Sequence, residues 1–357
     1  MNTKLVQVDV ESLQNQATHK QAMARLKEAG EIIRNGGLVA FPTETVYGLG
    51  GDALNPESSR KIYAAKGRPS DNPLIVHIAD MEHLGRITKQ IPKEAYKLAE
   101  HFWPGPFTMI LPKSDEVPTQ TTGGLDTVAV RMPSHPVAMA FIKEAGGYIA
   151  APSANLSGKP SPTLAKYVAQ DMDGRINMII DGDGVEIGLE STIVDLTGEK
   201  PMILRPGYIT EEMLNEVLGQ VEIDQTILSA DSKQRPKAPG MKYRHYAPKG
   251  ELTIVEGDPD KVASYINEQT ALHMAKGEKT GVIGTSDMAD SYRADSVKIA
   301  GDRDDEEAIA RQLYTFLREF DDENIEYMYS ESFDATGMGQ AVMNRLLKAA
   351  GHKVITV

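Results

Sequence analysis

The chain has 357 residues, which at roughly 100 to 200 residues per domain predicts two domains with cores of their own. Its 38 Lys and Arg against 51 Asp and Glu give a formal net charge of −13, which disfavours general attraction to nucleic acid. The sequence contains no cysteine, which excludes disulfides, thiolate metal sites and a cysteine nucleophile.

The first 210 residues alternate between helical and strand patterns. A helical pattern that stops at Gly36 is followed by a buried strand pattern at 38–41, and helical stretches are predicted at 92–102 and 135–145. Further short apolar runs, bounded by Gly, Pro, Ser or Asp, lie at 74–78, 107–111, 128–130, 149–151, 178–180 and 193–194. We expect an α/β fold in which these runs form one sheet with helices packed on it.

A second alternation follows residue 250. Strands are predicted at 252–255, 281–283, 297–299, 326–329 and at the C-terminal end, with helices at 260–274, 306–320 and 338–350. One apolar stripe lies on the second of these helices and is formed by Ile309, Leu313, Phe316, Leu317 and Phe320. This pattern predicts a smaller domain with a parallel sheet covered by helices.

A basic segment joins the two alternations. Residues 233–249 hold six Lys or Arg together with His245 and no acidic residue. We therefore expect a domain at 1–219, a basic linker at 220–250 and a domain at 251–357. No stretch has the apolar length of a membrane span and the N-terminus has no signal-peptide core, so we expect a cytoplasmic protein.

Common catalytic and nucleotide-binding motifs are missing from the sequence. It has no G-x-x-x-x-G-K-[ST], no H-E-x-x-H and no G-x-S-x-G, and 48–53 only loosely imitates a dinucleotide-binding fingerprint. The candidates are instead polar groups at the ends of predicted strands, where α/β folds form their pockets.

A basic loop at 66–73 is the first candidate. Lys66 and Arg68 flank a glycine, prolines stiffen the loop and Asn72 adds amide donors. An arginine fork and a lysine charge beside an accessible backbone suit a polyphosphate or a carboxylate, and a solvated turn is the alternative. His77, on the strand that follows, is either a ligand contact or an ordinary core histidine.

Other polar strand ends form a second set of candidates. The segment 41–49 adds hydroxyls and one carboxylate to an apolar strand, and it is either a pocket wall or a polar turn. Arg131 ends a predicted strand and either clamps a substrate carboxylate or forms a surface ion pair. Residues 150–158, 190–195 and 203–207 repeat the pattern of small and polar residues beside apolar runs.

These motifs, taken in order, resemble one family. Pro-Thr-Glu-Thr-Val-Tyr-Gly at 42–48, Lys-Gly-Arg-Pro at 66–69, Ala-Pro-Ser-Ala-Asn at 151–155 and Leu-Arg-Pro-Gly at 204–207 look like the motifs of the YrdC-type threonylcarbamoyl-AMP synthases. The linker and the C-terminal part resemble the long, two-domain form of that family. The resemblance implies a YrdC-like twisted mixed sheet with helices, followed by a smaller Rossmann-like parallel α/β domain.

The resemblance also implies site residues. An L-threonine site would be formed by Thr45, His77, Arg131, Ala151 and Ser191. An ATP site would be formed by Arg68, Asn72, Thr127, Ser153, Asn155, Ser161 and Arg205. Lys66 and Arg68 would be catalytic, and Lys242, Tyr243, Arg244 and His245 of the linker would form a lid over the nucleotide.

The implied reaction converts L-threonine, bicarbonate and ATP into threonylcarbamoyl-AMP and pyrophosphate, toward threonylcarbamoyladenosine beside the tRNA anticodon. Mg²⁺ would accompany ATP, held mainly by the phosphates and by no identified protein ligand. The expected partners are the downstream threonylcarbamoyl-transfer enzymes and a weak tRNA contact, with no membrane. Because the carbamate itself attacks the α-phosphorus, positioning and charge neutralisation replace a side-chain nucleophile.

Two alternative hypotheses for the function remain open. The chain could be a non-catalytic RNA-binding module, which a steep salt dependence of RNA binding without ATP turnover would indicate. It could also transfer a carbamoyl group from carbamoyl phosphate, as do hydrogenase maturation proteins with a related domain. Those proteins carry Cys-rich zinc modules, which this sequence lacks.

Overall fold

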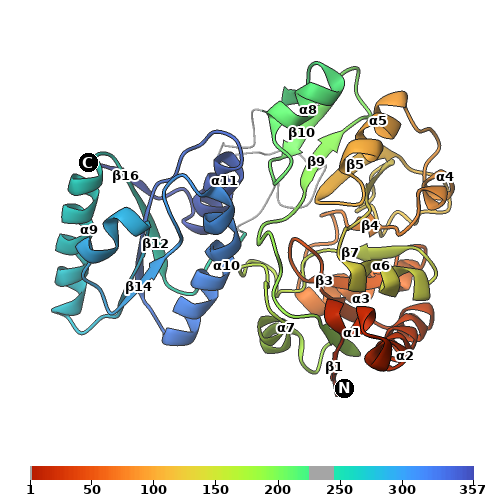
Figure 1. Cartoon of the computed structure of the whole chain (residues 1–357), viewed down its shortest axis with the longest axis horizontal. Coiled ribbons are helices and arrows are strands. Elements are labelled where there is room, and N and C mark those ends of the chain that lie inside the picture. Colours follow the sequence, from red (N-terminus) through yellow and green to blue (C-terminus); the bar gives the residue numbers. More distant parts are fainter. Residues whose placement is uncertain (1, 225–244) are drawn as a thin grey trace. The chain divides into compact units, whose positions relative to one another are not determined.

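The computed structural model describes residues 2–224 and 245–357, and these residues form two compact units. Unit 1 contains 2–157, 161–186 and 190–224, and unit 2 contains 158–160, 187–189 and 245–357. Figure 1 follows the chain through both. The sequence does not anticipate the two short segments that belong to unit 2. The expected linker boundaries at 219 and 250 remain predictions, because most of the linker lies outside the described residues.

Unit 1 is built on one mixed sheet. Its described strands lie in the order β1-β8-β2-β3-β7-β4-β6-β5-β9-β10-β11, with both parallel and antiparallel pairs. The strands are β1 (Lys4–Gln7), β2 (Val39–Phe41), β3 (Gly48–Asp52), β4 (Ile75–His77), β5 (Phe107–Pro112), β6 (Thr127–Arg131), β7 (Ile149–Ala151), β8 (Met178–Asp181), β9 (Thr192–Asp195), β10 (Met202–Arg205) and β11 (Glu222–Ile223). The mixed sheet predicted for this part of the chain is confirmed.

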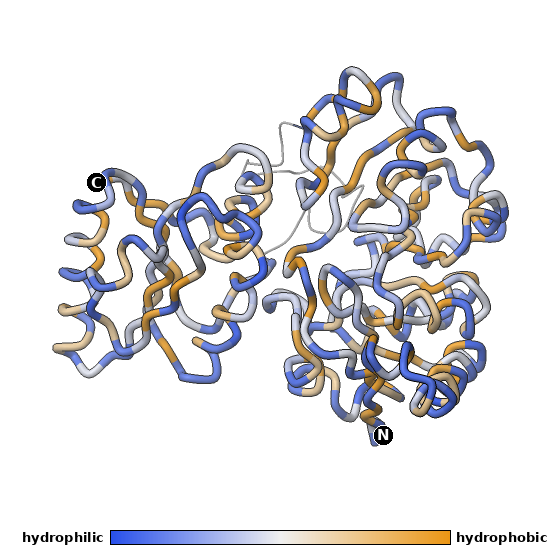
Figure 2. The backbone as a smooth tube through the Cα atoms, viewed as in Figure 1, coloured by the Kyte–Doolittle hydropathy of each residue, from blue (hydrophilic) through white to orange (hydrophobic). Residues whose placement is uncertain are grey.

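Helices cover both faces of this sheet (Figure 1). They are α1 (Val10–Gln14), α2 (Gln16–Arg34), α3 (Pro56–Lys66), α4 (Leu84–Ile87), α5 (Lys93–Phe102), α6 (Pro136–Glu144), α7 (Ala165–Met172) and α8 (Glu211–Leu218), with a short 3-10 turn η1 (Met81–His83). Strand β2 shows the alternation, since Val39 and Phe41 join the core beneath α2 and α6, whereas Ala40 joins the core beneath α3, α5 and α7. Figure 2 shows hydrophobic residues following the strands and hydrophilic residues following the loops.

Strand β3 is the main element that the sequence does not predict. Three of its five residues are glycine, which weakens a strand in isolation. A Cβ on Gly50 would lie 2.9 Å from Cγ2 of Ile149 and 3.1 Å from the Phe41 ring, and a Cβ on Gly48 would lie 3.1 Å from that ring. Tertiary packing therefore requires the glycines that make the segment look like a turn. The local sequence pattern also predicts no element at β1, β11, α1, α3, α4, α7 or α8.

Unit 2 contains the predicted parallel sheet, in the order β14-β13-β15-β12-β16. Its strands are β12 (Glu251–Glu256), β13 (Thr280–Gly284), β14 (Ser296–Ile299), β15 (Tyr327–Glu331) and β16 (Val354–Thr356). Its helices are α9 (Pro259–Met274), α10 (Glu306–Glu323) and α11 (Gly339–Ala349), with a 3-10 turn η3 (Ser286–Ser291). Helix α9 covers one face and α10 and α11 the other (Figure 1), as right-handed crossovers require. The Rossmann-like expectation is confirmed.

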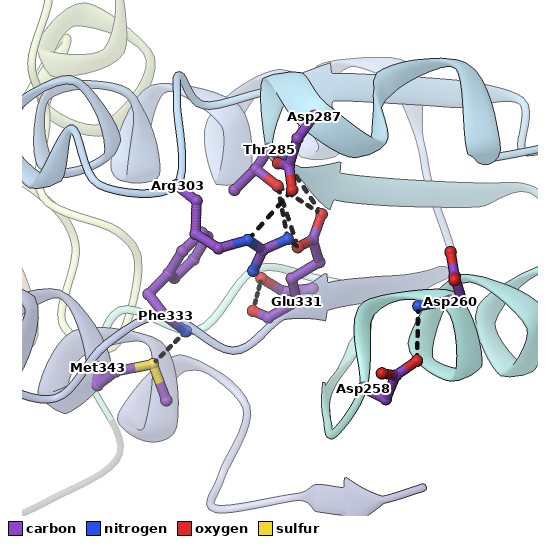
Figure 3. Close-up of polar contacts among 9 residues, drawn as sticks. Asp258, Asp260, Thr285, Asp287, Arg303, Glu331, Phe333 and Met343 are labelled. Carbon is purple, nitrogen blue, oxygen red and sulfur yellow. Dashed lines mark hydrogen bonds and ion pairs between the residues drawn. The ribbon is translucent and has the colours of Figure 1, made fainter.

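An ion pair between a buried carboxylate and a partly exposed arginine ties together the loops at the carboxyl ends of three strands of unit 2. Glu331, 2% exposed at the end of β15, accepts a hydrogen bond from the Thr285 backbone N–H at 2.8 Å and pairs with Nη2 of Arg303. Figure 3 shows Arg303 reaching from the loop after β14 between Glu331 and the side chains of Thr285 and Asp287.

None of the helices in the two described ranges is long and apolar enough to cross a membrane.

Candidate active site

Helix α3 positions the basic loop of unit 1. The side chain of Asn55 caps its first turn by accepting a hydrogen bond from the Glu57 N–H, and Pro56 occupies the first helical position. Gly67 ends the helix at a φ of 61°, a left-handed conformation that favours glycine. The chain thus turns sharply between Lys66, the last helical residue, and Arg68.

Lys66 is joined to the loop that follows β7. Its Nζ donates to the carbonyl oxygens of Ser153 and Asn155, the latter at 2.5 Å, although Lys66 is only 2% exposed. The hydroxyl of Ser153 donates to Oδ1 of Asn155 at 2.5 Å. Residues about 90 positions apart in the sequence are therefore brought together, and a buried ammonium fixes the backbone of this loop.

Arg68 and Asn72 form the second part of the basic loop. Nη2 of Arg68 donates to the carbonyl of Pro73 at 3.1 Å, and Asn72 is buried with its carbonyl accepting from the Tyr63 hydroxyl at 3.2 Å. Thr127 lies at the start of β6, the opposite end of that strand from Arg131. Because β4 and β6 are parallel and in register, Thr127 belongs to the end of the sheet where the basic loop enters β4.

A buried charged group surrounds Thr45 in the connection between β2 and β3. Nη1 of Arg131 donates to the Thr45 hydroxyl at 2.9 Å, and Nη2 lies 2.7 Å from Oε1 of Glu44. The Thr43 and Thr45 hydroxyls are 2.9 Å apart. Arg131 is 4% exposed and Glu44 2% exposed, so this arginine does not form the surface ion pair that was the alternative reading.

His77 is an uncharged neighbour of this group. It ends β4 opposite Arg131 in β6, its Nδ1 lies 3.1 Å from the Ile75 carbonyl, and its ring meets Phe41 edge-on. Burial, and then the positive charge of Arg131, lowers the pKa of His77 to about 3. The imidazole is therefore neutral at physiological pH. Ala151 ends β7 opposite Ile75 in β4, which places its backbone beside the same strand.

A third polar group gathers around Ser191, directly before β9. Arg205, at the end of β10, donates from Nε to the Ser191 carbonyl at 3.0 Å and from Nη2 to its hydroxyl at 3.1 Å. That hydroxyl also lies 2.8 Å from Oγ1 of Thr108 in β5. The buried hydroxyl of Ser161 donates to Oε1 of Glu190 at 2.6 Å.

The structure thus joins the expected site residues into several contact groups within unit 1. Glu44 and Thr108 contact these groups but are not among the residues that the sequence predicts for the site. Two sequence features could have indicated them. Glu44 is a carboxylate among hydroxyl residues, and Thr108 is a hydroxyl residue inside an apolar run. Lys242, Tyr243 and Arg244 of the expected lid lie outside the described residues, and His245 is described in unit 2, with its ring centre 5.5 Å from that of Tyr246.

Comparison with known proteins matches both parts of the chain. The family described as "Telomere recombination" (Sua5_yciO_yrdC) matches residues 31–207. The family "Threonylcarbamoyl-AMP synthase, C-terminal domain" matches residues 209–351. The chain is 49% identical to the threonylcarbamoyl-AMP synthase of Bacillus subtilis over 93% of this chain and 94% of that protein. It is 50% identical to that of Pyrococcus abyssi over 93% of this chain and 96% of that protein.

A solved structure gives the same result. The crystal structure of P. abyssi Sua5 complexed with L-threonine has a TM-score of 0.91, is 48% identical in sequence, and covers all of both chains. The similarity includes both units and the segments that carry the three polar groups. The chain therefore belongs to the threonylcarbamoyl-AMP synthase family.

Proposed function

We propose that this protein is an L-threonylcarbamoyladenylate synthase. It converts L-threonine, bicarbonate and ATP into threonylcarbamoyl-AMP and pyrophosphate, and so transfers an adenylyl group. The observation that carries this function is the family membership over nearly the full chain, together with a P. abyssi relative whose crystal structure contains L-threonine.

The L-threonine site is assigned to the group around Arg131. The guanidinium binds the substrate carboxylate, Thr45 and neutral His77 line the pocket, and the Ala151 backbone and Ser191 complete it. All five residues are buried, which strengthens polar contacts with the substrate and keeps water from the carbamate. Because burial and the Arg131 charge keep His77 neutral, it would offer the substrate a polar contact without a charge.

The ATP site is assigned to the basic loop, the Ser153–Asn155 loop and the Arg205 region. Arg68 and Arg205 neutralise phosphate charge, and Asn72, Thr127, Ser153, Asn155 and Ser161 supply polar contacts. Lys66 acts mainly through the backbone that it holds. The substrate nitrogen takes up the carbon of bicarbonate with loss of water. A carbamate oxygen then forms a bond to the α-phosphorus as the bond to pyrophosphate breaks, so no enzyme nucleophile is required.

Mg²⁺ is proposed to enter as part of the ATP substrate. No group of three or more His, Asp or Glu that could hold a metal occurs within 2–224 and 245–357. With nucleotides, Mg²⁺ usually keeps phosphate and water ligands and needs few ligands from the protein. The cation would offset charge on the departing pyrophosphate.

The instability of the product in water indicates which kind of protein must act after this enzyme. A mixed anhydride of a carbamate and a phosphate decomposes in water, so we infer that a threonylcarbamoyl-transfer enzyme takes it on to tRNA. We further infer that the enzyme is cytoplasmic. We also infer that it contacts tRNA weakly, because a net charge of −13 repels a polyanion.

The experiment is a substrate-omission assay of pyrophosphate release. The purified chain is incubated with MgATP, and L-threonine and bicarbonate are supplied together, singly or not at all. Release is expected only with both. Release that needs neither would mean that the protein is an ATP pyrophosphatase. ATP binding without release would favour the RNA-binding or carbamoyl-transfer alternatives.

A further inference from the structure

Glu44 is a buried carboxylate with few partners. It is 2% exposed, and among the described residues neither of its oxygens receives a hydrogen bond of good geometry, although Oε1 lies 2.7 Å from Nη2 of Arg131. Burying a carboxylate without hydrogen bonds is costly, and such groups in native structures call for a functional explanation. An ion pair of this kind contributes little net stability, because desolvation offsets the attraction.

The guanidinium of Arg131 has buried donors that no hydrogen bond uses. Nη1 donates to Thr45, and Nη2 lies 2.7 Å from Oε1 of Glu44, but in the described part of the chain neither Nη2 nor Nε makes a hydrogen bond of good geometry. Nε and Nη2 form one of the two edges through which arginine binds a carboxylate with two parallel hydrogen bonds. The hydrogen bond to Thr45 occupies Nη1, and the Nε–Nη2 edge keeps donors for a ligand, with the Glu44 carboxylate close to Nη2.

The chemistry of the reaction argues against a direct role of Glu44 at the reacting nitrogen. That nitrogen becomes part of a carbamate anion, which a neighbouring carboxylate would repel. The same charge is favourable beside the guanidinium of Arg131, where it restrains a long side chain that otherwise has many rotamers.

We propose that Glu44 is a positioning residue, which holds Arg131 so that its Nε edge receives the carboxylate of L-threonine. This inference rests on the proposed function and adds to it a residue that does not itself touch the substrate. Glu44→Gln, which keeps the shape and removes the charge, should raise the KM for L-threonine about tenfold, because binding must then order the arginine. The KM for MgATP should stay within about twofold, since the ATP groups do not contact Glu44.

The test measures both KM values and the Kd for L-threonine by calorimetry for the wild type, Glu44→Gln, Glu44→Asp and Glu116→Gln. Glu116 is a matched control, because it forms an exposed ion pair with Arg86. Glu44→Asp, which keeps the charge, should bind L-threonine better than Glu44→Gln does. A Kd for L-threonine that is unchanged or lower in Glu44→Gln would overturn the proposal, and a lower value would mean that Glu44 competes with the substrate.

A measurement on the wild type covers the case in which the variants do not fold. The Nε–H resonance of Arg131 should shift and exchange more slowly with water when L-threonine is added. No change at that resonance despite L-threonine binding would contradict the proposal. If wild-type protein does not bind L-threonine at all, the proposed function itself fails.

Discussion

Lys66 shows how a single buried charge organises the candidate site. Its ammonium has exchanged water for the backbone carbonyls of Ser153 and Asn155, and hydrogen bonds from a charged donor are stronger than those between neutral groups. The loop that carries two of the assigned ATP contacts is thus held from α3. Stability and catalysis should therefore depend on the same side chain.

Replacing Lys66 with Met keeps the length of the side chain and removes its donors. We expect the free energy of unfolding to fall by about 3 kcal/mol, since two buried carbonyls lose charged donors, and kcat to fall at least about 100-fold. Urea denaturation and pyrophosphate release would measure both. Lys61→Met is the control, because Lys61 lies on the same helix and donates from the surface to the carbonyl of Gly36. Equal losses in the two variants would contradict this role of Lys66.

His77 predicts a pH dependence of stability. Its pKa is about 3 in the folded protein, against about 6.5 in an unfolded chain. Between these values the unfolded state holds one more proton, so the free energy of unfolding decreases as pH falls, by up to about 1.4 kcal/mol per pH unit. His77→Gln should flatten the profile between pH 6 and 4, approximately the middle of this window. The exposed His101 provides the control, and a His101→Gln profile that flattens equally would contradict the assignment.

Residues at strand ends were the predictable part of the site. Arg131 and Arg205 stand where an apolar run ends, and Ser191 stands just before one. The other candidate residues came from the order of the family motifs. The contacts between side chains that are distant in the sequence were not predictable. Glu44 and Arg131 are 87 positions apart in the sequence, and only the folded chain brings them into contact. Local patterns could not distinguish a pocket wall from a polar turn at 41–49, because the difference lies in long-range contacts.

At the scale of elements, β3 explains why part of the fold could not be predicted from local pattern. Strands such as β5 and β7 contain enough apolar residues to be recognised, but β3 is held by its neighbours on both sides and needs glycine for them to approach. Its backbone completes the sheet on which β7 places Ala151. A glycine-rich strand therefore carries a functional requirement that its composition hides.

Substitution of Gly50 by Ala tests this packing. The new Cβ would meet Ile149 and Phe41 at 2.9 and 3.1 Å, and overpacking of a core typically costs about 1 to 3 kcal/mol. Gly85→Ala, in α4 with nothing within 4 Å of the new Cβ, should instead be neutral or stabilising by up to about 1 kcal/mol. Denaturant midpoints compare the two variants. Equal stability of the Gly50 variant and the wild type would show that β3 does not require glycine there.

The whole molecule consists of two units with separate cores. Unit 2 packs Val255, Ile266 and Val282 in a core of its own, and its parallel architecture was predictable because each strand and helix has a clear pattern. The proposed reaction uses residues of unit 1. The two short segments that belong to unit 2 could not be foreseen, because nothing in the local sequence at 158–160 or 187–189 departs from its surroundings.

Scanning calorimetry should resolve the two units as separate transitions. MgATP with L-threonine at about 100 times its Kd should stabilise the unit 1 transition by about 2.7 kcal/mol. Glu331→Gln removes the charge of a buried carboxylate that pairs with Arg303, so it should lower the temperature of the unit 2 transition, whereas Asp287→Asn at an exposed position should change it little. One transition that responds to both the ligands and Glu331→Gln would contradict independent cores.

The central claim is that unit 1 joins L-threonine, bicarbonate and ATP into one adenylate, and mass spectrometry of the product tests it most directly. The full chain is incubated with MgATP, L-threonine and isotopically labelled bicarbonate, and the quenched mixture is analysed at once. We expect threonylcarbamoyl-AMP that carries the bicarbonate label, together with an equal amount of pyrophosphate. AMP and pyrophosphate without a labelled adenylate, formed equally in the absence of L-threonine, would contradict the claim.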